Sequence, residues 1–183
     1  MGSLETVRLA LVKISRWLTL LGGYALLTSA MLVCADVFVR KAFNLSLRGA
    51  DELSGYALAM STSFGCVYAF FHRSHIRIDF VYRLLSRRVR SVLDVASALS
   101  LAVLAALAAH FAMGEFWEAL TFHALANTPL RTPLWIPQSI WAIGYVLFFL
   151  AIVVSVAESG LRLFLGEDAR VSQLLGMPES AEM

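Results

Sequence analysis

The sequence predicts an all-α membrane protein with four transmembrane helices, flanking interfacial amphipathic helices, and both termini in the cytoplasm (N-in/C-in). Of its 183 residues, 59% are apolar and 15% are charged. The mean hydropathy is +0.73. A soluble domain is usually about 45–50% apolar and about 25% charged. The apolar residues gather in blocks, which is typical of membrane helices. The net charge of +2 offers no footprint for nucleic-acid binding.

Four apolar blocks are long enough to cross the hydrocarbon core, which takes about 20 residues of α-helix. They are Leu18–Val39, Leu53–Phe71, Val92–Phe111 and Leu134–Val156. The second and third contain more Ala, Ser and Gly than the fourth, so their hydropathy is lower. The expected organisation is an arm over 1–17, a four-helix membrane domain over 18–156 and a cytoplasmic tail over 157–183.

The positive charges predict the orientation, because Lys and Arg concentrate in cytoplasmic loops. Eleven of them fall in the N-terminal arm, the loop after the second block and the tail, against four in the other loops. The loop after the second block also has apolar residues at helical spacing, from Ile76 to Val89, with Arg83, Arg87 and Arg90 on the opposite face. This pattern predicts a basic amphipathic helix in the headgroup layer. Ordinary positively charged flanks of the spans are the alternative, and the N-terminal arm repeats the pattern.

A proline-rich segment, Asn127–Gln138, precedes the fourth block. Pro129, Pro133 and Pro137 exclude a continuous helix through it. Pro133 or Pro137 suits the first turn of the fourth helix, where a missing N–H costs nothing. Trp135 and Trp141 are expected to anchor that helix at the outer membrane interface.

The ionisable residues favour neither an autonomous transporter or channel nor a haem protein. None lies near the centre of a predicted span, where substrate or ion paths usually place them. Possible haem ligands divide between the two membrane faces, with His72 and His75 on one and His110 and His123 on the other. The acidic pairs Asp51–Glu52 and Glu115–Glu118 have no neighbouring nucleophile or metal-ligand set. We therefore expect no enzymatic activity, cofactor or metal, and two free thiols at Cys34 and Cys66.

Small residues recur every four positions along two predicted spans. They are Ala57, Ser61, Gly65 and Ala69 in the second, and Ala98, Ala102 and Ala106 in the third. Small side chains let helix backbones approach closely in lipid. We expect Gly65 to meet a close neighbour inside the four-helix unit, with a subunit interface as the alternative.

Several motifs together resemble a known family. They are the run Asp36-Val-Phe-Val-Arg40, the triplet Asp51-Glu52-Leu53, Gly65, the run His75-Ile-Arg-Ile-Asp79, and the segment Thr128–Gln138. Their order is similar to that in the small membrane subunit (Q subunit) of tripartite ATP-independent periplasmic (TRAP) transporters. Many members have an aromatic residue shortly before the acidic pair. Here Arg48-Gly49-Ala50 stands there, so any role of that residue does not carry over.

The resemblance implies a scaffold subunit in the bacterial inner membrane. Its partners would be a large sodium-coupled membrane subunit and a periplasmic binding protein that delivers an organic acid. Two alternatives stay open, an autonomous small transporter or channel and a cytochrome-like redox subunit. The candidates for partner contact or helix packing are Arg40, Arg48, Asp51, Glu52, Ala57, Ser61, Gly65, Ala69, His75, Asp79, Arg131, Pro133, Trp135 and Pro137. The outer loops 40–52 and 115–131 are the expected contacts of the binding protein.

Overall fold

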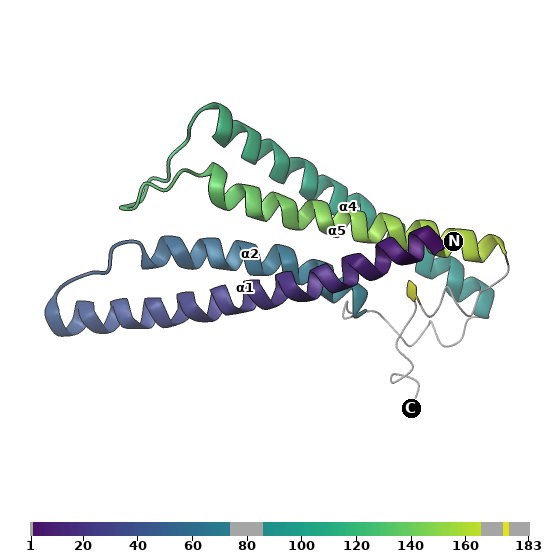
Figure 1. The fold of residues 1–183 in the computed structure, drawn as a ribbon, viewed down its shortest axis with the longest axis horizontal. Coiled ribbons are helices and arrows are strands. Elements are labelled where there is room, and N and C mark those ends of the chain that lie inside the picture. The colour runs from purple at the N-terminus through teal and green to yellow at the C-terminus, as the bar shows by residue number, and fades with distance from the viewer. Residues whose placement is uncertain (1, 74–85, 166–173, 176–183) are drawn as a thin grey trace.

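A computed structural model describes residues 2–73, 86–165 and 174–175 of the chain. The described part is built from long helices, as the sequence predicts (Figure 1). The helices are α1 (Gly2–Phe43), α2 (Ala50–Phe71), α4 (Arg87–Thr121) and α5 (Trp135–Phe164). His75, Asp79 and most of the expected amphipathic helix after the second block lie outside the described residues.

Within the described residues, three helices are long and apolar enough to cross a membrane. They are Leu4–Phe43, Arg88–Thr121 and Trp135–Leu163. Helix α2 is not among them, because Ser, Thr, Gly and Tyr residues lower its hydropathy. The chain is therefore a multi-pass helical membrane protein, while the fourth span and the orientation are still predictions.

Helices α1, α4 and α5 extend well past the predicted spans. Helix α4 runs from Arg87 to Thr121, so residues 115–121 of the expected outer loop are helical. Helix α1 has 42 residues without a break, so residues 2–17 of the expected arm and the first span form one continuous helix. At a rise of about 1.5 Å per residue, α1 is about 63 Å long. Helix α5 continues to Phe164, so the first residues of the expected tail are helical as well.

The helices pack side by side in a single row, in the order α4, α5, α2, α1. Helix α4 packs along α5, α5 along α2, and α2 along α1, with a smaller contact between α1 and α5. Figure 1 shows the hairpins α1–α2 and α4–α5 side by side at the end near the N-terminus and diverging toward their connecting loops. We call the end with the loops 44–49 and 122–134 the loop end, and the opposite end the terminal end.

Buried small residues recur every seven positions along two helices. On α1 they are Ser15, Gly22 and Ser29, followed by Asp36; on α4 they are Ser91, Ala98, Ala105, Ala112 and Ala119. A seven-residue repeat keeps one seam against a partner helix that winds gently around it. The predicted four-residue stripe on α4 is therefore only partly correct, because Ala102 and Ala106 lie beside the buried seam and are half-buried.

Two glycines mark the closest helix approaches. A Cβ added to Gly22 of α1 would lie 2.9 Å from the Cα of Ser61, and one added to Gly144 of α5 would collide with the side chain of Ser63. Around Gly65, in contrast, nothing in the described structure lies within 4 Å of an added Cβ. The expectation that Gly65 packs inside the unit is wrong, because α2 turns Ser61 and Ser63 toward its neighbours and leaves Gly65 on an outward face.

Candidate functional site

The buried charged residues of the described chain gather near the helix ends. They are Asp36, Glu52, Asp94, Glu158 and Arg162. Between the ends, the exposed hydroxyls of Thr28, Thr62 and Ser100 donate to carbonyls four residues back in their own helices, at 2.8–3.1 Å. Such bonds satisfy a hydroxyl locally and make it compatible with lipid. The buried charge of the described chain is thus concentrated at the loop end and the terminal end.

Glu52 fastens the proline-rich loop to α2 at the loop end. The Thr128 hydroxyl donates to its Oε2, and the Tyr56 hydroxyl donates to its Oε1 at 2.7 Å. Thr132 contributes further hydrogen bonds from its side chain and its backbone. These bonds, the one from Thr128 above all, lower the pKa of Glu52 from its ordinary value of 4.5 to about 2, against the raising effect of desolvation. The carboxylate is therefore ionised at neutral pH and holds α2 and the loop together.

Backbone hydrogen bonds give the proline-rich loop a defined shape. The Ala126 N–H donates to Thr132 O at 2.9 Å, and the Leu134 N–H donates to Ala124 O at 3.0 Å. The Arg131 N–H donates to Thr128 O at 3.1 Å, which closes a turn that includes Pro129. Helix α5 then begins at Trp135.

The prediction for Pro137 is confirmed, because this proline lies in the first turn of α5. Pro133 lies just before the helix and forms an isolated antiparallel bridge with Leu125. The two loops of this end also touch each other, since Leu130 packs over Gly49, whose φ of 108° favours glycine.

Asp36 holds the other loop of this end. Its side chain is almost fully buried and pairs with Arg40. It also accepts hydrogen bonds from the Ser46 hydroxyl at 3.1 Å and the Leu47 backbone N–H at 2.5 Å. These hydrogen bonds from the loop 44–49 to Asp36 hold the loop against the end of α1.

A second cluster joins the first and last helices at the terminal end. Glu158 of α5 accepts from Arg8 Nε at 2.9 Å and from Arg162 Nη2 at 2.7 Å. The Glu158 side chain is 5% exposed. Sequence reasoning missed this residue because it placed Glu158 in the tail. The spacing of Glu158 and Arg162, four residues apart on one helix face, was the available signal.

The remaining predicted residues divide into buried and exposed groups. Ala57 is buried, Ser61 meets Gly22, and Ala69 is half-buried. The exposed ones are Asp51, Arg48, Arg131 and Trp135, all at the loop end. In the part of the chain that the structure describes, no group of three or more His, Cys, Asp or Glu side chains could bind a metal ion.

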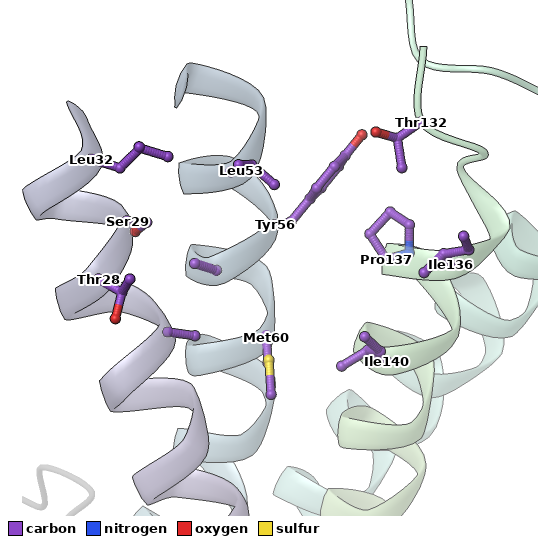
Figure 2. Close-up of a pocket in the computed structure, with 12 residues that line it drawn as sticks. Thr28, Ser29, Leu32, Leu53, Tyr56, Met60, Thr132, Ile136, Pro137 and Ile140 are labelled. Carbon is purple, nitrogen blue, oxygen red and sulfur yellow. The ribbon is translucent and has the colours of Figure 1, made fainter. Parts of the chain in front are cut away.

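An apolar groove of about 550 Å³ lies among α1, α2 and α5 below the loop end. Figure 2 shows Tyr56 pointing across it toward Thr132, with Pro137 and Ile140 on the opposite wall. Two of the hydroxyls in its lining, those of Thr28 and Ser29, donate to carbonyls of their own helix, and that of Tyr56 donates to Glu52. The groove therefore offers shape and apolar surface but no free hydrogen-bond donor from these three residues.

The fold and these end clusters define a multi-pass helical membrane protein whose described helices pack in a row. Residues 29–160 match the family model described as tripartite ATP-independent periplasmic transporters, DctQ component, and the chain belongs to this family. The resemblance seen in the sequence motifs is confirmed by this match. No curated protein and no solved structure matches the chain significantly. The family is a transporter component rather than an enzyme family.

Proposed function

We propose that this chain is the scaffold subunit of a sodium-coupled TRAP transporter for organic acids, and that it carries no substrate or ion path of its own. Family membership supports this role, together with one structural observation. The buried charges of the described residues sit near the helix ends, and those whose partners are identified above are engaged inside the chain. A path through the middle of the membrane usually needs polar or charged groups there.

The row of helices supports the same proposal. A pore or an alternating-access site needs helices that enclose a path, and it often uses broken helices. Here α1, α4 and α5 are long and unbroken, and α4 packs mainly on α5 at the edge of the row. A row presents two broad faces, which suits a subunit that widens the static part of a larger assembly.

We propose four membrane spans, with the terminal end in the cytoplasm and the loop end in the periplasm of the bacterial inner membrane. The segment Leu53–Phe71 of α2 is the fourth span. It lies between α1 and α5, so protein rather than lipid covers much of its surface, and a lower hydropathy is tolerated there. The excess of Lys and Arg near the terminal end supports the orientation.

The proposed partners are a large membrane subunit and a periplasmic binding protein. At the loop end, Glu52 and Asp36 fix two loops as one surface, on which Arg48 and Arg131 are exposed. A surface that is held in shape loses little conformational freedom when a partner docks. This supports the loop end as the surface that receives the binding protein.

Uptake of labelled organic acids into proteoliposomes tests the proposal. The chain alone should show no uptake above empty liposomes under a sodium gradient. Uptake should require the large subunit and the binding protein. Robust sodium-driven uptake by this chain alone would contradict the scaffold role, and failure to co-purify with the large subunit would contradict the assembly.

A further inference from the structure

A second, smaller pocket of about 220 Å³ lies at the terminal end. Helix α1 contributes Arg8, Leu9 and Val12 to it. The end of α2 and the two residues after it contribute Phe70 to Arg73, and Ser155 and Leu174 complete the described lining. None of the end clusters described above fills this space. It differs from the groove at the loop end because basic side chains form part of its wall.

The arginines among the described lining residues are basic groups that an anionic ligand can contact. Arg8 and Arg73 line the pocket, and its described lining contains no acidic side chain. Glu158 of α5 accepts hydrogen bonds from both Arg8 and Arg162, so its carboxylate does not serve Arg8 alone. Arg8 bonds Glu158 through its Nε, which leaves the outer N–H groups of its guanidinium available for a second anion.

The other wall of the pocket is apolar. Phe70 and Phe71 are half-buried at the end of α2, and Leu9 and Val12 extend the apolar surface along α1. A ligand that fits must therefore combine an anionic group with a hydrocarbon chain. Phospholipids have this chemistry, and basic pockets between helices at the cytoplasmic face are known to take anionic headgroups.

We propose that this pocket binds the phosphate headgroup of an anionic phospholipid of the cytoplasmic leaflet. Arg8 and Arg73 pair with the phosphate, and an acyl chain begins along the apolar wall. This placement rests on the orientation proposed above. The bound lipid would bridge the first and second helices beside the Arg8–Glu158 pair.

The test uses the full-length chain in neutral detergent and measures the affinity for phosphatidylglycerol by native mass spectrometry. Phosphatidylcholine with the same acyl chains and inorganic phosphate are the comparison probes. The variant Arg73→Gln removes a charge from the pocket. The matched control Arg16→Gln removes one from an exposed position of α1, two turns further along, that does not line the pocket.

The wild-type chain should prefer phosphatidylglycerol to phosphatidylcholine, and inorganic phosphate should not compete at millimolar concentration. Arg73→Gln should weaken phosphatidylglycerol binding about fivefold, which corresponds to about 1 kcal/mol per basic residue. Arg16→Gln should leave it nearly unchanged. Equal losses in both variants would overturn the proposal in favour of diffuse surface charge.

Two further outcomes would also overturn it. Competition by inorganic phosphate alone would assign a simple anion site. Loss of co-purification with the large subunit in Arg73→Gln, with unchanged lipid affinity, would assign the pocket to a protein interface. Lipid binding is measured without transport, so failure of the scaffold proposal in the uptake assay is a separate result.

Discussion

Arg8 and Glu158 lie 150 positions apart in the sequence, yet the Nε of Arg8 donates to Oε2 of Glu158 at 2.9 Å. This bond joins the start of α1 to the last turns of α5, beyond the predicted spans. The Arg8 side chain is 22% exposed and that of Glu158 is 5% exposed. The pair is therefore shielded enough from water to contribute to stability, unlike most surface ion pairs.

Loss of the Glu158 carboxylate should destabilise the helix row. The change Glu158→Gln leaves Arg8 and Arg162 without their shared anion, and hydrogen bonds to charged groups contribute about 1.5–3 kcal/mol each. We expect a loss of about 1–3 kcal/mol, since Arg8 stays partly hydrated. Thermal unfolding in detergent measures it, and Glu115→Gln, at an exposed acidic position of α4, is the matched control.

A double-mutant cycle separates the pair from general charge effects. Arg8→Gln and Glu158→Gln should be less damaging together than the sum of the single losses, because each single change already breaks the same bond. Strict additivity of the two losses would show that the ion pair contributes nothing of its own.

Gly22 and Gly23 offer a comparison within one helix turn. Gly22 faces Ser61 at close range, whereas nothing in the described structure lies near Gly23. Gly22→Leu should cost roughly 1–3 kcal/mol through overpacking, and Gly23→Leu should be tolerated. Melting temperatures of the two variants decide the point. A tolerated Gly22→Leu would mean that α1 and α2 do not approach as closely as described.

Gly65→Leu should leave the stability of the isolated chain unchanged, because the added side chain meets open space. Gly144→Leu should lower it, since Ser63 stands directly in the way. Co-purification with the large subunit then reports on the outward face of α2. A stable Gly65→Leu chain that no longer co-purifies places this face at the subunit interface. Loss of the isolated chain itself would contradict the open placement.

The pKa of Glu52 predicts an acid-sensitive loop end. Its folded-state pKa is lowered to about 2 from the ordinary 4.5. The stabilising effect is therefore fully present above about pH 4.5 and is lost as the pH falls toward 2. Unfolding measured between pH 7 and pH 3 should show this loss in the wild type and a flatter profile in Glu52→Gln. Parallel pH profiles of the wild type and Glu52→Gln would show that Glu52 is not the source of the acid sensitivity.

Reversal of the exposed charges at the loop end tests the docking surface. Arg48→Glu combined with Arg131→Glu should weaken binding-protein docking, mostly at low salt, because exposed charges are screened over about 10 Å at 0.1 M ionic strength. The effect is read from uptake kinetics at two salt concentrations. The matched control is Lys13→Glu with Arg16→Glu, at exposed positions toward the terminal end. Unchanged low-salt uptake kinetics in the loop-end variant would show that Arg48 and Arg131 lie in loops that only connect helices.

Hydropathy predicted the positions of the long helices, because crossing a bilayer needs continuous apolar segments. The boundaries were less accurate. The ionisable residues at the ends of α1 and α5 led us to assign these segments to an arm and a tail outside the membrane domain. In the structure, Arg8 and Glu158 form an ion pair inside the fold. A pairing between positions so far apart has no local signal in one sequence.

The sequence predicted small residues at the helix contacts correctly, but it did not predict which positions along each helix make those contacts. Small residues were expected at the contacts, and Ala57, Ala98 and Ser61 are found there. Their period could not be chosen from the sequence, since Ala and Ser are so frequent that four-residue and seven-residue repeats both occur. The positions of α1 and α5 determine which face of α2 is buried. That face includes Ser61 and Ser63, so Gly65 lies outside the contact.

The unbroken length of α1 has a mechanical consequence. A helix of about 63 Å is roughly twice as long as the hydrocarbon layer is thick, which is about 30 Å. Near one end Arg8 bonds it to α5, and near the other end its Asp36 holds the loop that follows the helix. Such a rod converts a change of tilt at one membrane surface into a displacement at the other. In the proposed scaffold role, this geometry would allow a force on the loop end to act on the opposite side of the bilayer.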